Sequence, residues 1–416
     1  YHSTMSQTVH QYVDEARLRK DIENTAAFGA VSNTDGRGRT VLPGTEPNRQ
    51  AREYFRDSLE DAGLDVRIDA VGNIAGRWTP EGVSLAADPV AAGSHLDSVV
   101  EGGIFDGVLG VYAALESIRA IQEAGVTPDR PLEVVSFTEE EGSRFSDGVL
   151  GSSVASGRED AAEALSYEDE SGITLAEALD GIGFRGTQTI DAAAWDAWIE
   201  LHIEQSGRLE QAGAVTGIVT GITGTVRSHV DIVGEADHAG TTAMGDRRDA
   251  LAAASELTLA VESIANDVVE NEAETAVATV GQHSTEPNSV NVIPGRVHLG
   301  IDVRDVCPES LSQIMTRIRQ RITQIETERG VQITYTEPYD VAPSQMTPRC
   351  IDHIRKAAAA ADVTAIELHS GAGHDTMQIA DITDVGMLFA PSIGGVSHSP
   401  KEQTTWSDCT ENTRVL

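Results

Sequence analysis

The 416-residue sequence predicts an α/β protein in which a larger domain with a mixed sheet is interrupted by an inserted α+β sandwich. Three observations predict this fold class. Short β-branched runs alternate with helical stretches in the first half of the chain, as in βαβ units. A strand-helix-strand-strand-helix-strand order follows a glycine-rich transition, and the chain is too long for one hydrophobic core. We expect the larger domain at residues 5–214 and 339–416 and the insert at 215–338.

The first part of the larger domain begins with a helical pattern from Val9 to about Gly63, in which the loop Ser32 to Glu46 separates two amphipathic stretches. The expected strands that follow are Leu64 to Val71, Val90 to Ala92, Leu132 to Phe137 and Trp195 to Ile203, with a helix at Gly110 to Ala124. Because strands joined through helices pair in parallel, we expect a mostly parallel sheet here.

The insert is expected to begin after the glycine-rich segment Gly213 to Ile222. Its expected strands are Thr225 to Val233, Thr275 to Gln282, Arg296 to Val303 and Val331 to Tyr335, and its helices are Asp249 to Asn266 and Pro308 to Arg329. Near Ala342 the chain is expected to return to the larger domain, with a helix at Ile351 to Ala361 and a short strand at Gly386 to Phe389.

The composition excludes several function classes. A formal charge of -36 disfavours binding to nucleic acid or to anionic membranes, and no apolar run of about 18 residues predicts a membrane span. The acidic residues are scattered through periodic segments and do not form the blocks of a disordered tail, which favours a folded, halophilic protein. The start YHSTM lacks the apolar run of a signal peptide, and three separated cysteines without a CxxC pair fit a cytoplasmic location.

Metal-ligand residue types gather at the ends of expected strands or in tight loops. They are His95, Asp97, Asp106, the run Glu139 to Glu141, His202 and His398. Taken singly, each has an ordinary structural explanation: a satisfied histidine, a solvated run of glutamates, or an aspartate in a turn. Their spacing favours chemistry, because strand ends are where open α/β sheets place their sites.

Specific spacings within this set suggest roles. His95 and Asp97 point to the same side of an extended strand, so the aspartate can orient the imidazole. Asp106 lies between glycines, so a tight loop can present its carboxylate between two cations. Two such cations polarise a carbonyl group and acidify a water, and a nearby carboxylate must then move the proton. Glu140 and Glu141 offer a base and a ligand side by side.

The motifs occur in a fixed order between about Val71 and Glu402. They are GSHLDSVVEGGIFDGVLGV, EEEGSRF, ELHIEQSGRLE, GEADHAGTTAMGDRRDA, SVNVIPG, DVRD, SGAGHDT and GGVSHSPKE. This set resembles the N-carbamoyl-L-amino-acid hydrolase, β-ureidopropionase and allantoate amidohydrolase family, which belongs with the dimetal aminopeptidase-like hydrolases. The resemblance implies an aminopeptidase-like catalytic domain with an inserted lid and dimerisation domain, and a homodimer.

The resemblance also implies a role for each matching residue. His95 and His202 would each bind one metal, Asp106 would bridge, Glu141 would bind the partner ion, and His398 would complete the pair. Glu140 would be the general base. Such carboxylate and imidazole ligands suit zinc, manganese, cobalt or nickel, among which the sequence does not choose.

Substrate contacts are implied by the same resemblance. Gln205 and His374 would contribute from the larger domain, and His238, Asn291 and Arg304 from the insert. Arg304 could bind a substrate α-carboxylate through two hydrogen bonds, although a surface ion pair with Asp302 or Asp305 would explain it equally well. His238 lies in a glycine-flanked loop and could act in catalysis by donating to the developing oxyanion when the domains close.

The implied reaction is hydrolysis of the carbamoyl C–N bond of an N-carbamoyl-L-amino acid. Allantoate and N-carbamoyl-β-alanine remain open as substrates, an aminoacylase or dipeptidase is a broader alternative, and a catalytically inactive binding protein is the alternative outside enzymes. The sequence departs from the family pattern at a few positions. The usual Gly-x-Thr-Arg-Leu string reads Gly38 to Leu42 with its arginine displaced to Arg39, and Ser206, Ala243 and Ser399 replace usual glycine, proline and asparagine residues.

Overall fold

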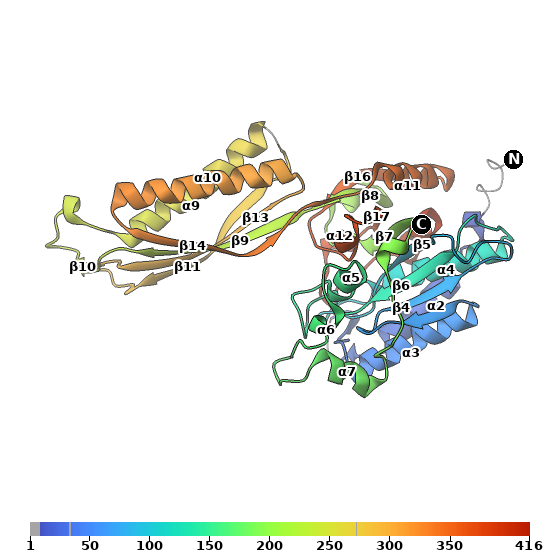
Figure 1. The fold of residues 1–416 in the computed structure, drawn as a ribbon. Helices are drawn as coiled ribbons and strands as arrows, with labels where there is room; N and C mark the ends of the chain where they lie inside the picture. Colours follow the sequence, from blue (N-terminus) through green and yellow to red (C-terminus); the bar gives the residue numbers. More distant parts are fainter. Residues whose placement is uncertain (1–8, 33–34, 272) are drawn as a thin grey trace. The chain divides into compact units, whose positions relative to one another are not determined.

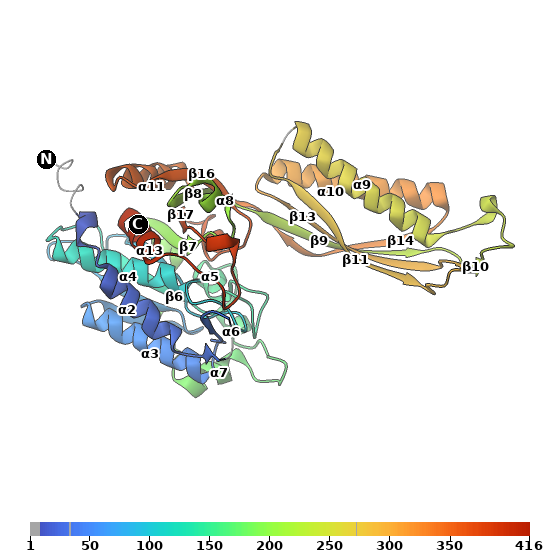
Figure 2. The ribbon, with the colours of Figure 1, turned by 180° about the vertical axis from the view of Figure 1, so that it is seen from behind.

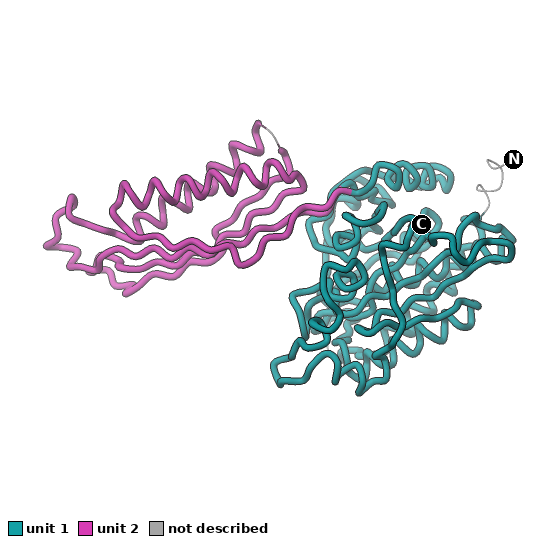
Figure 3. Tube along the Cα trace, in the orientation of Figure 1, with its two compact units in different colours: residues 1–220, 346–416 teal, residues 221–345 magenta. Residues whose placement is uncertain are grey.

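The computed structural model describes residues 9–32, 35–271 and 273–416. The chain divides into two compact units, one formed by residues 1–220 and 346–416 and the other by residues 221–345 (Figure 3). The sequence placed these boundaries at 214/215 and 338/339. The chain leaves the first unit within strand β8 (Thr216–Ile222) and returns after strands β14 (Gln332–Val341) and β15 (Ser344–Gln345). The first boundary lies inside a strand and the second directly follows one, so neither coincides with a loop that the composition would reveal.

The larger unit is built on a mixed sheet, which confirms the predicted fold class. Its strand order is β8-β17-β7-β5-β6-β4-β3, and β16 (Ala365–Ser370) pairs with β8. The strands are β3 (Asp65–Ile68), β4 (Ile74–Trp78), β5 (Val90–His95), β6 (Leu132–Phe137), β7 (Ala197–Ile203) and β17 (Asp384–Ala390). Neighbours within β17-β7-β5-β6 are parallel, whereas β3, β4 and β8 pair antiparallel at the two sides. The parallel strands therefore bring their carboxyl ends to one edge.

Helices cover this sheet. The longer ones are α2 (Glu15–Ala26), α3 (Glu46–Asp61), α4 (Val108–Glu123), α11 (Pro348–Ala360) and α13 (Trp406–Val415), and the shorter ones are α5 (Leu150–Ala155), α6 (Ala161–Ala164), α7 (Leu175–Ile182), α8 (Arg208–Ala212) and α12 (Thr376–Ile379). Helices α2, α4 and α13 pack together (Figure 2). Helix α4 lies between β5 and these helices, which fits its apolar character around much of its surface. Its residues Leu109 and Leu115 are fully buried in the hydrophobic core of the larger unit.

The second unit is an α+β sandwich. Strands β9 (Gly224–Val233), β11 (Val277–Glu286), β13 (Arg296–Asp305) and β14 lie in the order β11-β13-β9-β14, and each neighbouring pair is antiparallel. Helices α9 (Ala250–Asn271) and α10 (Pro308–Arg329) both lie on one face of the sheet (Figure 1). The strict alternation of burial along β9 and β13 follows from this one-sided cover. A short ribbon of β10 (Asp237–His238) and β12 (Val292–Ile293) extends from the sandwich.

Some elements differ from their prediction. The segment predicted as a glycine-rich transition contains strand β8, because Gly217 lets the strand pack closely: an added Cβ there would lie 2.7 Å from Leu368. Strands β4 and β16 and helix α13 were not predicted. The predicted loop Ser32 to Glu46 includes β2 (Gly38–Arg39), paired with β1 (Ala30–Val31), and its residues 33–34 lie outside the described part, as do residues 1–8.

The described residues include no helix that is long and apolar enough to cross a membrane.

Candidate metal centre

The predicted ligands come together at the carboxyl edge of the parallel strands. His95 is the last residue of β5, His202 lies near the end of β7, and Glu141 follows β6. Asp106 lies just before α4, and His398 lies in the loop between β17 and α13. Segments more than 300 residues apart in the sequence thus supply one site.

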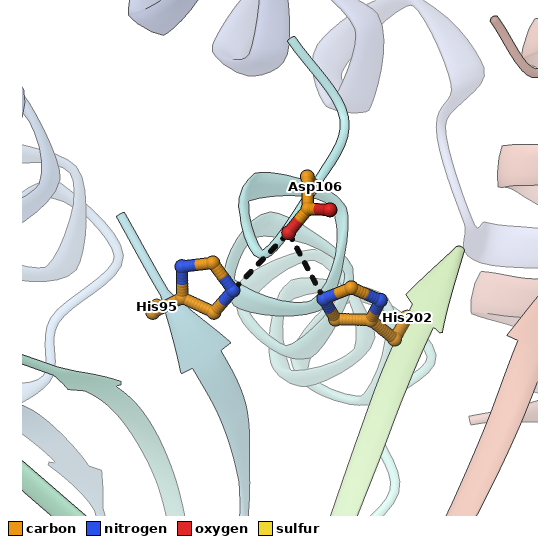
Figure 4. Close-up of side chains that lie close together, drawn as sticks. All are labelled: His95, Asp106 and His202. Atoms are coloured by element: carbon orange, nitrogen blue, oxygen red, sulfur yellow. Dashed lines mark ion pairs between the residues drawn. The ribbon is translucent and has the colours of Figure 1, made fainter. Parts of the chain in front are cut away.

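Asp106 lies between two imidazoles (Figure 4). Its Oδ1 atom is 3.3 Å from Nε2 of His95 and 3.3 Å from Nε2 of His202, and all three side chains are buried. The Nδ1 atom of His202 lies 3.0 Å from the carbonyl oxygen of Ile203, and Nδ1 of His95 lies 3.3 Å from that of Asp97. Because each Nδ1 is placed to donate to a carbonyl oxygen, each Nε2 carries a lone pair. The lone pair on His202 accepts a hydrogen bond from the backbone N–H of Gly107 (3.2 Å), whereas the one on His95 is open to a metal ion.

The same aspartate takes part in a second group. His398 Nε2 lies 3.6 Å from Asp106 Oδ2 and 3.4 Å from Glu141 Oε2. The structure therefore divides the predicted ligands into His95 with His202 and Glu141 with His398, and Asp106 belongs to both groups. The side chain of His398 is 50% exposed, so this second group opens to solvent whereas the first is buried.

Glu402, a buried residue that is not among the predicted ligands, holds the loop of Asp106. Glu402 Oε1 accepts hydrogen bonds from the backbone N–H groups of Phe105 (2.9 Å) and Asp106 (3.1 Å). Ser397 links the two carboxylates, since its Oγ lies 3.0 Å from Asp106 Oδ2 and 3.2 Å from Glu402 Oε2. Burial and the charge of Asp106 raise the pKa of Glu402 to about 7. The available signal was its position at the end of the string GGVSHSPKE.

Asp97 connects the two halves of the centre. Its carboxylate accepts from the backbone N–H groups of Glu140 (3.4 Å) and Glu141 (3.1 Å). Its Oδ1 lies 3.7 Å from Nδ1 of His95, farther than its own carbonyl oxygen. The main-chain carbonyl group of Asp97 thus lies closer to His95 than its carboxylate does. The carboxylate instead positions the backbone of Glu140 and Glu141.

Glu139, the first residue of the glutamate run, has a structural role. It is fully buried at a φ of 57°, and its Oε1 accepts from the backbone N–H groups of Arg144 (2.7 Å), Phe145 (2.7 Å) and Ser146 (3.4 Å). Burial raises its pKa to about 7. These bonds fix the turn after β6 that presents Glu140 and Glu141.

Glu139→Ala is expected to lower the free energy of unfolding by about 1–3 kcal/mol, because it leaves buried backbone N–H groups without an acceptor. Glu139→Gln keeps an acceptor oxygen and serves as the matched control, with a smaller expected loss. Thermal unfolding followed by circular dichroism measures both variants. Equal stability of the alanine variant and the unaltered protein would contradict this role.

The residues present fit a divalent metal ion. Nε2 of His95 is buried and has no hydrogen-bond partner among the described residues. Burial raises the pKa of Glu140 well above its ordinary value, and burial together with Asp106 raises that of Glu141 to about 8. Burial also opposes ionisation of Asp106, but the imidazoles of His202 and His95 outweigh it and hold its pKa well below the ordinary value. Buried carboxylates beside the unpartnered imidazole nitrogen of His95 are stabilised by a cation among them.

Two of the predicted substrate residues lie beside this centre. Gln205, at a φ of 58°, donates from Nε2 to Asp106 Oδ2 at 2.8 Å, and its buried Oε1 has no partner in the part of the chain that the structure describes. The ring of His374 packs edge-on against the ring of His202, with 4.6 Å between the ring centroids. The Nε2 atom of His374 lies 2.9 Å from Ser370 Oγ. Burial and His202 lower the pKa of His374 well below its ordinary value, so its ring is neutral.

The other three predicted substrate residues lie in the second unit, in two places. His238 and Asn291 are neighbours, because Ala239 N donates to the Asn291 carbonyl oxygen (3.0 Å) next to the ribbon of β10 and β12. Arg304 lies near the end of β13, opposite Thr225. Its Nε donates to Asp302 Oδ1 at 2.7 Å and its Nη2 to Oδ2 at 3.2 Å. The ion pair with Asp302 that the sequence left open is therefore present.

This fold and site define the class of protein. A model of peptidase family M20/M25/M40 matches residues 91–416, so the chain belongs to that family of hydrolases, and its site is built to bind divalent metal. Among curated proteins it is similar to an N-carbamoyl-L-amino-acid amidohydrolase from Paenarthrobacter aurescens, with 38% identity over 98% of this chain and 97% of the relative. It is also similar to an allantoate amidohydrolase from Bacillus subtilis, with 37% identity over 92% of each chain.

Solved structures agree with this placement. A crystal structure of an amidase of the hydantoinase/carbamoylase family from Burkholderia multivorans has a TM-score of 0.88 and 34% identity, and the match covers 97% of this chain and 96% of that one. The family resemblance predicted from the sequence motifs is confirmed.

Proposed function

We propose that this protein hydrolyses the carbamoyl C–N bond of N-carbamoyl-L-amino acids with the help of two divalent metal ions. The observation that carries the proposal is the pair of ligand groups that share Asp106, with His95 and His202 in one and Glu141 and His398 in the other. The similarity to an N-carbamoyl-L-amino-acid amidohydrolase along almost the whole chain supports this substrate class.

When bound, the two ions would supply Lewis acidity to the carbonyl group and lower the pKa of water. The residues of the chain supply the proton transfer. Glu140 belongs to neither ligand group, and its Oε2 lies 3.5 Å from Nε2 of His95, at the edge of the first group. Its side chain is 11% exposed, and burial raises its pKa. Such a carboxylate takes a proton from the attacking water and passes it to the leaving nitrogen, after which the carbamate breaks down to ammonia and carbon dioxide.

Substrate recognition is assigned to the five predicted substrate residues, beginning with the two beside the metal centre. The unpartnered Oε1 of Gln205 can accept an N–H of the carbamoyl group. The neutral ring of His374 can contact the bound group without adding charge. Arg304 would bind the α-carboxylate, and Asn291 and His238 would contact the substrate, His238 by donating to the oxyanion.

Allantoate is the second candidate substrate, and the 37% identity to an allantoate amidohydrolase favours it as the nearest alternative. N-Carbamoyl-β-alanine is a third ureido compound that the same metal ligands and base could cleave. An aminoacylase or dipeptidase activity is more remote. The intact ligand set and Glu140 argue against a catalytically inactive binding protein.

Further properties belong to the same proposal. We infer a homodimer from the family resemblance, with zinc, manganese, cobalt or nickel as the metal. Adaptation to high salt is supported by the charge of -36. A cytoplasmic location is supported by Cys307, Cys350 and Cys409, which are all free thiols.

The proposal is tested by a hydrolysis panel in high salt with each metal supplied in turn. The panel contains N-carbamoyl-L-amino acids, N-carbamoyl-β-alanine, allantoate and an N-acetyl-amino acid, and ammonia or free amine is measured. We expect the highest kcat/KM with an N-carbamoyl-L-amino acid. Ammonia release from allantoate alone would overturn this assignment, and no turnover of any compound would overturn the enzyme class.

Arg304→Ala is expected to lower kcat/KM for an N-carbamoyl-L-amino acid by roughly 10–100-fold, the loss that follows from one charge-assisted hydrogen-bonding group. Arg227→Ala is the matched control. Arg227 lies on β9, opposite Asp302 of β13, and its Nε donates to Asp302 Oδ2 at 3.3 Å. The Arg227→Ala variant therefore removes the same charge from the same face of the sheet. Steady-state kinetics on both variants measures the effect. An equal loss in the two variants would assign it to surface charge and contradict carboxylate binding by Arg304.

A further inference from the structure

Arg39 is an unusual residue in the larger unit, because its guanidinium is completely buried. It lies in β2, and its backbone pairs with Gly102 in the loop that leads to Asp106. Arginine is among the residues least often buried without full pairing. Its Nε and Nη1 atoms nevertheless have no hydrogen-bond partner within the described ranges. A buried guanidinium with two unpaired nitrogen atoms is unfavourable unless another interaction stabilises its charge.

The remaining nitrogen of Arg39 binds the main chain directly after His95. Nη2 donates to the carbonyl oxygens of Leu96 (2.9 Å) and Asp97 (3.1 Å). The same carbonyl oxygen of Asp97 lies 3.3 Å from Nδ1 of His95. One oxygen is thus shared between the guanidinium and the imidazole, so Arg39 contacts the group that orients His95.

The charge of Arg39 is compensated by carboxylates of the metal centre. Burial lowers the pKa of Arg39, and the negative charges of Asp97, Glu402 and Asp106 oppose that effect. All three carboxylates are at least 95% buried, so charges of one sign are crowded in a medium of low polarity. A fixed cation near them reduces their mutual repulsion.

We propose that Arg39 is a positioning residue of the metal centre, which fixes the carbonyl group that orients His95 and provides the buried positive charge behind Asp97, Asp106 and Glu402. It acts through these groups and touches neither substrate nor metal. The inference rests on the proposed metal centre and adds a determinant of its affinity. The sequence showed Arg39 only as a displaced arginine in the string Gly38 to Leu42.

Arg39→Met removes the charge and the donors while keeping a long apolar side chain, and Arg39→Lys keeps the charge without the planar fork. In the full-length, chelator-treated protein, we expect Arg39→Met to weaken the binding of cobalt or manganese roughly 10–100-fold in isothermal titration calorimetry. Arg39→Lys should recover part of that loss. The visible absorption of the cobalt-loaded protein should change in Arg39→Met, because the ligand field at His95 changes.

Val41→Ala is the matched control, since Val41 is a fully buried neighbour in the same segment but has neither charge nor side-chain donors. It should keep the metal affinity and the cobalt spectrum. Arg39→Met with unaltered affinity and spectrum, or Val41→Ala with an equal loss, would overturn the proposal. If Arg39→Met does not fold, Arg39→Gln takes its place with the same expected and contrary results. Failure of the unaltered protein to bind metal would instead overturn the proposed function.

Discussion

Glu140→Gln is expected to lower kcat by roughly 10²–10⁴-fold, the usual contribution of a general acid–base group. Glutamine has the same shape as glutamate but cannot take a proton from water or return it to the leaving nitrogen. Glu140 lies in neither of the two ligand groups, so the variant should bind metal as the unaltered protein does. A large loss of kcat with full metal content would therefore identify a missing proton transfer.

The measurement combines steady-state kinetics with metal analysis by mass spectrometry on the same sample. Glu139→Gln is the neighbouring control. Within the described residues, the hydrogen bonds that Glu139 accepts come from backbone N–H groups, so this variant should keep the kcat of the unaltered protein. Near-native kcat for Glu140→Gln with metal bound would refute the assigned base. Loss of metal together with activity would assign Glu140 to the ligands.

Asp106→Asn is expected to weaken both metal positions at once and to lower kcat/KM by roughly a thousandfold or more. The physical reason is that Asp106 belongs both to the group of His95 and His202 and to the group of Glu141 and His398, and its charge lies between the imidazoles of His95 and His202. Asparagine keeps the shape but loses the negative charge. Metal activation supplies several kcal/mol to such a reaction, which corresponds to this loss of rate.

Single-group variants make this test sharp. His202→Ala removes a ligand from the buried group of His95 and Asp106 but not from the group of Glu141 and His398, whereas His398→Ala does the reverse. Each should retain about one ion per chain in metal analysis, whereas Asp106→Asn should retain fewer at the same free metal concentration. Two tightly held ions in Asp106→Asn would show that the aspartate does not bridge. Loss of both ions in His398→Ala would show that the two positions are not separable.

Local patterns predicted much of the fold. Helix α10 has the bounds Pro308–Arg329 that its period and caps predict, since proline starts it and Gly330, in the left-handed conformation, ends it. Strand β6 likewise runs from Leu132 to Phe137 as expected. Strand β8 escaped prediction because its glycines are unfavourable in a strand by themselves and are required only by the neighbours that pack on them. Preferences that depend on distant contacts are not visible in a short window of sequence.

The same distinction applies to the site. The sequence by itself predicted which residues would carry the chemistry, because His95, Asp106, Glu140, Glu141, His202 and His398 stand in long ordered motifs that match a known family. It also determined the acidic character of the protein.

Only the tertiary structure decided how these residues are grouped in space. It grouped His95 with His202 and Glu141 with His398 around one aspartate, and it placed the carboxylate of Asp97 on the backbone of the two glutamates. It also revealed the hydrogen bonds of Glu139, Glu402 and Arg39, on which their proposed supporting roles rest. The reason is geometric: parallel strands β5, β6 and β7 end at one edge, so residues far apart in sequence meet there, and burial gives their charges the strong interactions that define the centre.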